Sequence, residues 1–131
     1  MSAVTRFREA VERKDVDAVD QLLAPDIVFH SPVTFHPFIG RDTVARLLAE
    51  VEQVFSDFRY TDELEADGAH GLIFRASVAG KEIEGIDLLR IDADGLIADF
   101  TVMLRPLSAL VPFAQAMGER AVAAGLETTR Q

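Results

Sequence analysis

One carboxyl group stands among apolar neighbours in a segment with the pattern of a strand. Asp87 occurs in the run IEGIDLLRI, where an extended chain turns it to the same side as Ile83 and Leu89. Burying an unpaired carboxylate is so costly that such a group is partnered, neutral or useful. We therefore expect either a pocket acid with a raised pKa that serves a ligand, or a structural carboxyl bonded to a Ser, Thr, His or backbone N–H group.

Two histidines flank a serine in the segment FHSPVTFHPF. Imidazole titrates near neutral pH, so His30 or His36 is a candidate general base at the mouth of a pocket. The alternative is that His30 caps the edge of a sheet and that His36 belongs to a loop. Ser31 lacks a nucleophile motif such as G-x-S-x-G, and we expect a ligand contact from it or no role.

The sequence offers little that would hold a metal ion. It contains three well-separated histidines and no cysteine, so no zinc-ligand spacing is present. The turn DADG at 92–95 begins like a calcium loop, but its twelfth position is Met103, which has no carboxylate. We expect neither a metal nor another cofactor.

Composition narrows the class of partner. The chain has 22 acidic and 13 basic residues and a net charge of −9, which argues against nucleic acids and anionic membranes. It contains no apolar signal core and no membrane-length apolar run, so we expect a cytoplasmic protein. Its 131 residues, 49% of them hydrophobic, predict one globular domain over 1–131.

Apolar residues at helical spacing predict helices near the start of the chain. These cover residues 4–11, 16–23 and a third segment with Asp42 as its N-cap. The second helix is expected to stop before Pro25, and Pro112 is expected to begin a final helix.

Strands are predicted mainly in the second half of the chain. An early strand at 26–31 is followed by a proline-containing loop at 32–38. Alternating segments then predict an antiparallel meander of four strands, at 58–66, 70–79, 81–91 and 96–105.

Helices laid on one face of a curved antiparallel sheet make an α+β domain, here with a cone-shaped apolar interior. The phase of the strands turns nearly pure hydrocarbon inward, with Asp87 as the exception. Phe38 and Tyr60 are expected in the wall of this interior. The side chains of this interior and its rim that we expect to contact a small apolar ligand are Phe35, Phe74, Phe100, Val102 and Leu104.

The opposite face of the predicted sheet is not purely polar. By the same phase it carries Ile73, Ile86, Leu88 and Met103. Apolar residues on an outer face favour coverage by a second subunit, so we expect a two-fold homodimer through this face.

At this point the sequence resembles a known family. FREAVERKDVDAVDQLLAPDIVFHSPV, then GRDTV and GIDLLRIDADGLIADFTVMLRPL, resemble the NTF2-like superfamily and, within it, the SnoaL-like proteins. That branch includes polyketide cyclases, ketosteroid isomerases and limonene-epoxide hydrolases. The resemblance covers about residues 4–105 through the order and spacing of its motifs. It implies a cone-shaped α+β fold with an apolar pocket, usually dimeric.

The resemblance also implies site residues, taken position by position. For ketosteroid isomerases, it places the tyrosine oxyanion donor at Phe7, the proton-shuttling aspartate at Ser31 and the protonated aspartate at Asp87. The resemblance therefore implies that Phe7 and Ser31 also contact the ligand. For epoxide hydrolases, it places an arginine at Gly85, an aspartate at Asp87 and a second aspartate at Val102. Asp87 is the group that both sets keep, and neither set is complete.

Three functions remain as hypotheses. The first is a cofactor-free isomerase, cyclase, dehydratase or hydrolase, with Asp87 as acid and His30 or His36 as base. Its substrate would be apolar, with one carbonyl, hydroxyl or epoxide oxygen. The second is a binder of such a molecule without catalysis. The third is an interaction module that uses the outer sheet face or the final helix.

Overall fold

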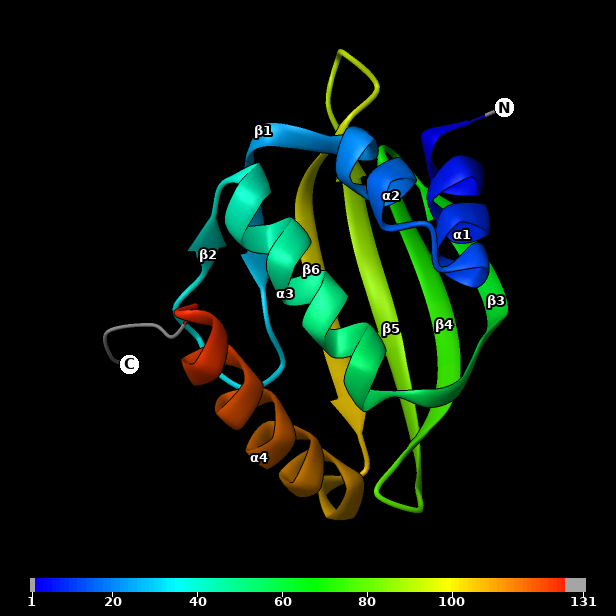
Figure 1. Cartoon of the computed structure of the whole chain (residues 1–131). Helices are drawn as coiled ribbons and strands as arrows, with labels where there is room; N and C mark the ends of the chain where they lie inside the picture. The colour runs from blue at the N-terminus through cyan, green and yellow to red at the C-terminus, as the bar shows by residue number, and fades with distance from the viewer. Residues whose placement is uncertain (1, 127–131) are drawn as a thin grey trace.

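The computed structural model describes residues 2–126, which form four helices and six strands (Figure 1). The predicted α+β class is confirmed, while residues 1 and 127–131 of the domain expected over 1–131 lie outside the described part. The helices are α1 (Ala3–Arg13), α2 (Val16–Leu22), α3 (Arg41–Val54) and α4 (Leu107–Ala124). The strands are β1 (Leu23–His30), β2 (Phe38–Ile39), β3 (Ser56–Ala66), β4 (Ala69–Val78), β5 (Lys81–Ile91) and β6 (Ile97–Arg105).

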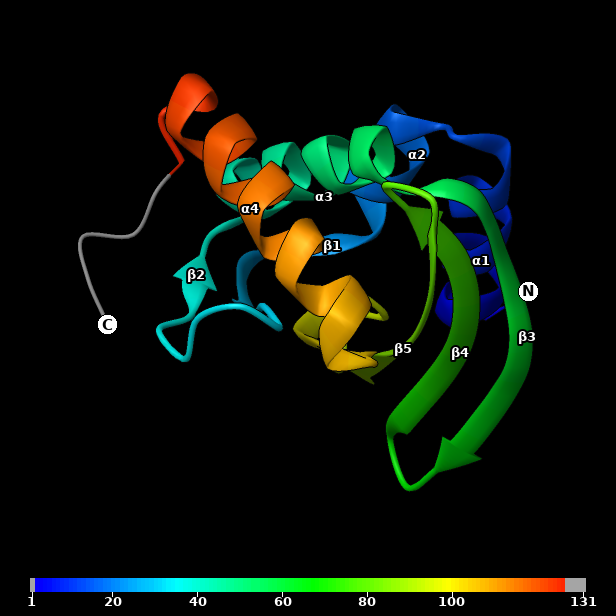
Figure 2. The same ribbon diagram turned by 90° about the horizontal axis from the view of Figure 1, so that it is seen from below.

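All six strands join in one curved sheet with the order β2-β1-β6-β5-β4-β3 (Figure 2). The meander from β3 to β6 is antiparallel as predicted, whereas β1 pairs with β6 in parallel. Helix α3 packs on β1 and α4, and α4 also contacts β4, β5 and β6. Helices therefore enclose the concave side of the sheet.

The inward phase predicted for β5 is confirmed. Ile83, Gly85, Asp87 and Leu89 are buried, and the residues between them are less so. On the opposite face, Ile73, Ile86 and Met103 are register partners across β4, β5 and β6. They form an apolar row across the sheet, and Met103 in this row is 56% exposed.

The start of β1 differs from the prediction. The strand begins at Leu23 and includes Pro25, so the expected boundary between Pro25 and residue 26 is wrong. The pairing of β1 with β6 shifts register between Leu23 and Val28. Pro25 thus lies in an irregular stretch, where a residue without an N–H group is tolerated.

The N-cap of helix α3 lies two residues before the predicted one, Asp42. Gly40 is the N-cap, with φ of 104°, a conformation that favours glycine. Asp42 lies in the first turn instead, where its charge suits the positive end of the helix dipole.

Helix α4 begins at Leu107, so the prediction that Pro112 opens it is wrong. The carbonyl of Pro106 accepts hydrogen bonds from the N–H groups of Ala109 and Leu110, which closes the first turn. Pro112 lies inside the helix and removes one backbone hydrogen bond. Burial of Ala109 and Phe113 on either side of it offsets this loss by packing α4 against the sheet.

Among the described residues, no helix has both the length and the apolar character needed to cross a bilayer.

Candidate functional site

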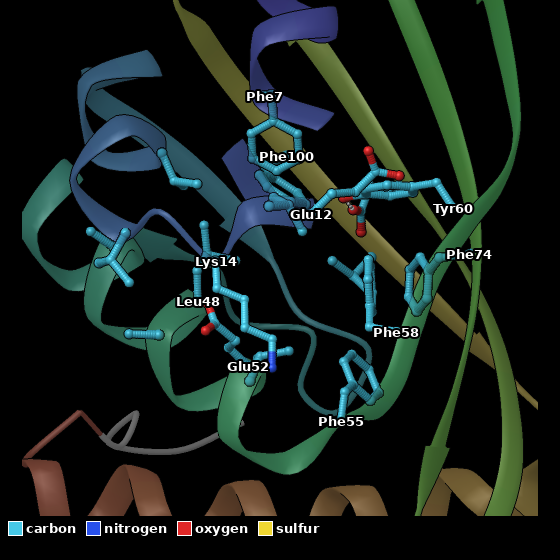
Figure 3. A pocket seen from close by; sticks show the side chains of 18 of the residues that line it. Phe7, Glu12, Lys14, Leu48, Glu52, Phe55, Phe58, Tyr60, Phe74 and Phe100 are labelled. Carbon is cyan, nitrogen blue, oxygen red and sulfur yellow. Dashed lines mark hydrogen bonds between the residues drawn. The ribbon is translucent and has the colours of Figure 1, made fainter. Parts of the chain in front are cut away.

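A cavity of about 550 Å³ lies between the helices and the concave face of the sheet. This volume is in the range of small-molecule sites. Aromatic rings form much of its wall, contributed by α1, α4, most of the strands and the end of α3 (Figure 3). They are Phe7, Phe29, Phe55, Phe58, Tyr60, Phe74, Phe100 and Phe113.

Asp87 lines this cavity from the middle of β5. Its register partners on the two neighbouring strands are Leu72 and Val102, so both cross-strand neighbours are apolar. The residue is only 6% exposed and is the one buried polar or charged residue in the described part of the chain. The strand alternation that buries Ile83 and Leu89 therefore also carries a carboxyl group into the apolar interior.

Tyr60 is the partner of Asp87. Its hydroxyl donates a hydrogen bond to Asp87 Oδ2 at 3.0 Å. The phenol ring is fixed by edge-on contacts with Phe58 and Phe74, whose centroids lie 5.0 and 6.3 Å away (Figure 3). Buried hydroxyl and carboxyl groups thus satisfy one another inside an aromatic cluster.

Burial shifts the ionisation of both groups. It raises the pKa of Asp87 from 3.8 to about 7, and the hydrogen bond from Tyr60, which favours the ionised form, opposes this rise. Burial, followed by the charge of Asp87, holds the pKa of Tyr60 well above its usual 10.0. Near neutral pH, a substantial share of Asp87 is consequently protonated.

The second oxygen of Asp87 is the one available to a ligand. Tyr60 engages Oδ2, and among the described residues no buried side-chain nitrogen or oxygen lacks a partner. No side chain in the described part of the chain bonds to Oδ1, so this oxygen is not among those fully buried atoms, and it is the one that a ligand in the cavity lined by Asp87 can reach. In the protonated form this oxygen can donate a hydrogen bond into an apolar space, where such a bond is strong.

The absence of a side chain on glycine at position 85 shapes the site next to Asp87. A Cβ atom at this position would collide with the Phe74 ring and with Leu104, and would lie 2.8 Å from the Met103 carbonyl oxygen. Glycine therefore lets the Phe74 ring lie across β5, two residues from Asp87 on the same face. That ring helps to keep water from the carboxyl group.

Four further charged side chains line the cavity: Glu12, Lys14, Glu52 and Asp57. Figure 3 shows Glu12 pointing toward Tyr60. After burial and Asp87, the charge of Glu12 is a further cause of the raised pKa of Tyr60. The cavity wall thus includes a carboxylate whose charge reaches Tyr60, the partner of Asp87.

Arg8 forms an exposed ion pair with Glu12. Its Nε lies 3.6 Å from Glu12 Oε2, one helical turn along α1, and its Nη1 lies 3.3 Å from Glu63 Oε1 on β3. Glu63 does not line the cavity. Arg8 therefore contacts one carboxylate inside the site and one outside it.

The candidate bases His30 and His36 line neither this cavity nor the smaller one described below. Strand alternation turns Phe29 inward and His30 outward, where His30 Nε2 lies 3.3 Å from Asp99 Oδ2. His36 is in the loop between β1 and β2, where its carbonyl accepts a hydrogen bond from Thr34 Oγ1 at 3.0 Å. Phe35 in the same loop is 94% exposed.

The structure brings together five of the predicted site residues around the main cavity. These are Asp87, Phe7, Phe74, Phe100 and Val102. Ser31 lines the smaller cavity instead, and Leu104 lines neither cavity.

A smaller cavity of about 190 Å³ lies beside α4 and the loop after β1. Ser31 borders it, and its hydroxyl oxygen accepts hydrogen bonds from the N–H groups of Val33 and Thr34, both at 3.2 Å. These bonds stabilise the loop. No group of three or more His, Asp or Glu side chains in residues 2–126 could hold a metal ion.

Sequence reasoning missed the partnership of Tyr60 with Asp87 and the position of Glu12. A signal for the first existed, because Phe58 and Tyr60 share a strand face and Tyr60 is the single tyrosine of the chain. No comparable signal marked Glu12, which lies among other charged residues of α1.

Comparison with known proteins agrees with this architecture. The profile of the SnoaL-like domain family matches residues 4–100. No curated protein sequence matches the chain significantly.

Solved structures are similar to it over nearly the whole chain. A steroid delta-isomerase from Pseudomonas aeruginosa has 37% identity and a TM-score of 0.88, covering 95% of this chain and 93% of its own. An uncharacterised bacterial protein with a cystatin-like fold from Silicibacter pomeroyi DSS-3 has 33% identity and a TM-score of 0.89, covering 94% and 87%.

A putative ketosteroid isomerase from Kribbella flavida DSM 17836 has 18% identity and a TM-score of 0.66, covering 79% of this chain and 76% of its own, and shows the fold alone. The match of the family profile and the two structures with more than 30% identity confirm the predicted resemblance. The chain belongs to the SnoaL-like family of the NTF2-like superfamily.

Proposed function

We propose that the protein is a cofactor-free isomerase that moves a proton within an apolar molecule carrying a carbonyl oxygen. The observation that carries this proposal is the Asp87 carboxyl, hydrogen-bonded to Tyr60 and turned into a cavity of hydrocarbon. A neutral acid in such a place favours a ligand with one acceptor oxygen. The similarity to a steroid delta-isomerase makes a ring ketone the first substrate class to test.

Asp87 is the hydrogen-bond donor that polarises the carbonyl group in this reaction. Tyr60 occupies Oδ2, which leaves the proton on Oδ1 free to meet the ligand oxygen. Negative charge that develops on that oxygen strengthens the hydrogen bond, so the transition state gains more than the ground state.

Glu12 is the proton acceptor. It lines the same cavity, its charge acts on Tyr60, and Arg8 forms an ion pair with it. The two carboxyl groups have different surroundings, since Asp87 is enclosed by hydrocarbon and the Glu12 side chain is 42% exposed. Such a difference separates an acid from a base in one site.

The proposed step balances without a co-reactant. Glu12 takes a proton from the carbon next to the carbonyl, and that C–H electron pair forms a C=C bond. The carbonyl π pair moves to oxygen, which is stabilised by Asp87. The proton then returns from Glu12 to the far carbon of the conjugated system, and the carbonyl forms again with the double bond displaced.

A β,γ-unsaturated 3-ketosteroid tests the proposal, because the conjugated product absorbs in the near ultraviolet. Asp87→Asn should lower kcat/KM by about 10²–10³-fold, as removal of an oxyanion donor does. Glu12→Gln should lower it by about 10²–10⁴-fold. Glu63→Gln is the matched control, since it removes the other carboxylate bound by Arg8 from outside the cavity, and its rate should stay near wild type.

Equal rates in Glu12→Gln and Glu63→Gln would show that Glu12 is not the proton acceptor. Turnover by Asp87→Asn at the wild-type rate would show that Asp87 does not stabilise the carbonyl oxygen in the transition state. If the wild-type protein neither converts the steroid nor exchanges its α-protons with deuterated water, the proposal of catalysis on ring ketones fails.

Binding without catalysis is the second candidate. Phe7 and Val102, at positions where the family resemblance implies reactive groups, present only hydrocarbon to the cavity. Native mass spectrometry of the freshly purified protein beside Asp87→Ala tests it. An apolar adduct that is chemically unaltered and absent from the variant would support binding alone.

A further inference from the structure

The two cavities share part of their walls. Phe29, Pro32, Val51 and Phe113 line both the main cavity and the smaller one of about 190 Å³. The Phe113 ring stacks on Phe55 with centroids 5.3 Å apart, so α4 forms a wall common to the two spaces.

The smaller cavity presents hydrocarbon. Its wall from α4 consists of Phe113, Met117, Gly118, Ala121 and Val122.

Its two hydroxyl groups are engaged within their own loop. Ser31 Oγ accepts from the N–H groups of Val33 and Thr34, and Thr34 Oγ1 donates to the His36 carbonyl. Among residues 2–126, no charged side chain lines this cavity. Its chemistry therefore fits an alkyl group rather than a polar one.

We propose that the smaller cavity is a second subsite, which takes the apolar tail of the molecule whose carbonyl oxygen binds Asp87. This rests on the proposed function, and it adds a substrate class: ring ketones with an alkyl extension at the end remote from the carbonyl. Asp87 lines the main cavity and not the smaller one, so the carbonyl would bind in the main cavity while the tail reaches past the shared wall residues into the smaller one.

Gly118 gives a direct way to close the subsite. It lies inside α4 and lines the smaller cavity, and a Cβ atom added there meets nothing within 4 Å. Replacing glycine inside a helix also favours the helix, so folding is preserved. Gly118→Phe should fill the space, and Ala121→Leu should fill it from the next turn.

The experiment measures Kd by calorimetry for saturated 3-ketosteroids with no tail or with an ethyl, butyl or hexyl tail. Each methylene buried should tighten wild-type binding by about fourfold. The ratio of Kd values between the tail-less and hexyl ketones should fall to about one in Gly118→Phe and Ala121→Leu. Glu119→Phe is the control, since Glu119 is exposed on the same helix and lines neither cavity.

The outcomes separate the two proposals. A wild-type ratio near one, or a ratio that survives in both filled variants, overturns the subsite while ketone binding stands. A tail effect that Glu119→Phe abolishes equally also overturns it. Failure of every ketone to bind wild-type protein overturns the proposed function and the subsite with it.

Discussion

The Tyr60 hydroxyl reaches the Asp87 carboxyl across an intervening strand, with 3.0 Å between Oη and Oδ2. Tyr60 lies on β3 and Asp87 on β5, and β4 separates them in the sheet. The curvature of the sheet and the aromatic cluster around Phe74 bring the two side chains together. A carboxyl group with a raised pKa is thereby positioned at the wall of an apolar cavity.

Tyr60 should resist ionisation at high pH. Burial and the nearby charge of Asp87 raise its pKa well above 10.0. Tyr60 is the single tyrosine and the chain has no tryptophan, so the ultraviolet difference absorbance of phenolate reports on this residue alone. Native protein at about pH 10.5 should show almost no phenolate, while the urea-unfolded chain shows mostly phenolate. Equal absorbance in the two states would contradict the burial.

Asp87 should make stability fall as pH rises. Its pKa is raised from 3.8 to about 7 in the folded state, so the folded protein binds more protons between these values. The contribution is fully present below pH 3.8 and is lost as pH rises through about 7. The shift corresponds to roughly 4 kcal/mol of unfolding free energy. Asp87→Asn removes the ionisation and should lose this part of the pH dependence.

Urea unfolding of wild type and Asp87→Asn at several pH values measures that contribution. The difference in unfolding free energy between them should change most in the window from about pH 4 to about pH 7. Asp94→Asn, in the exposed turn between β5 and β6, is the control and should follow wild type. A constant difference between wild type and Asp87→Asn would mean that Asp87 is not neutral when buried.

Gly85→Ala should destabilise the protein by about 1–3 kcal/mol, because the new methyl group must displace the Phe74 ring or Leu104. Chemical denaturation gives the change. Gly118→Ala is a matched control, since its added Cβ meets nothing within 4 Å and the helix gains propensity. If the two alanine variants have equal stability, the close packing of Phe74 over β5 is wrong.

Pairing of two copies through the outer sheet face is tested at Met103. The row Ile73–Ile86–Met103 is apolar and Met103 is exposed, so wild-type protein should sediment as a dimer. Met103→Glu should shift it toward monomer by placing like charges across the interface. Val111→Glu, a similarly exposed apolar position on α4, should remain dimeric. A monomeric wild-type protein would refute the pairing.

The fold class could be predicted from the sequence, because long alternating segments separated by turn residues indicate a meander with little ambiguity. The same alternation identified Asp87, since β5 keeps strict period-2 burial from Ile83 to Leu89. The element boundaries predicted from the two prolines were wrong, because Pro25 is accommodated by a register shift and Pro112 by packing on both sides. Local rules do not include these tertiary compensations.

The partners of Asp87 were less accessible to prediction. The hydrogen bond from Tyr60 crosses β4, so it depends on sheet curvature, which residue pattern does not specify. His30 appeared chemically suited to a site, but strand phase turns it away from the cavity, toward Asp99. Glu12 enters the cavity wall because α1 lies against β3, a contact between segments far apart in sequence.

The central claim is that burial at the wall of the cavity raises the pKa of Asp87 to about 7, so that a substantial share of it is a neutral acid near neutral pH. Carbon-13 NMR of the aspartate carboxyl groups measures this directly, with the Asp87 resonance assigned by its loss in Asp87→Asn. The structure predicts a titration midpoint of about 7 for that resonance. A midpoint near the ordinary value of 3.8 would contradict the account, because Asp87 would then be a carboxylate at neutral pH with no proton to donate.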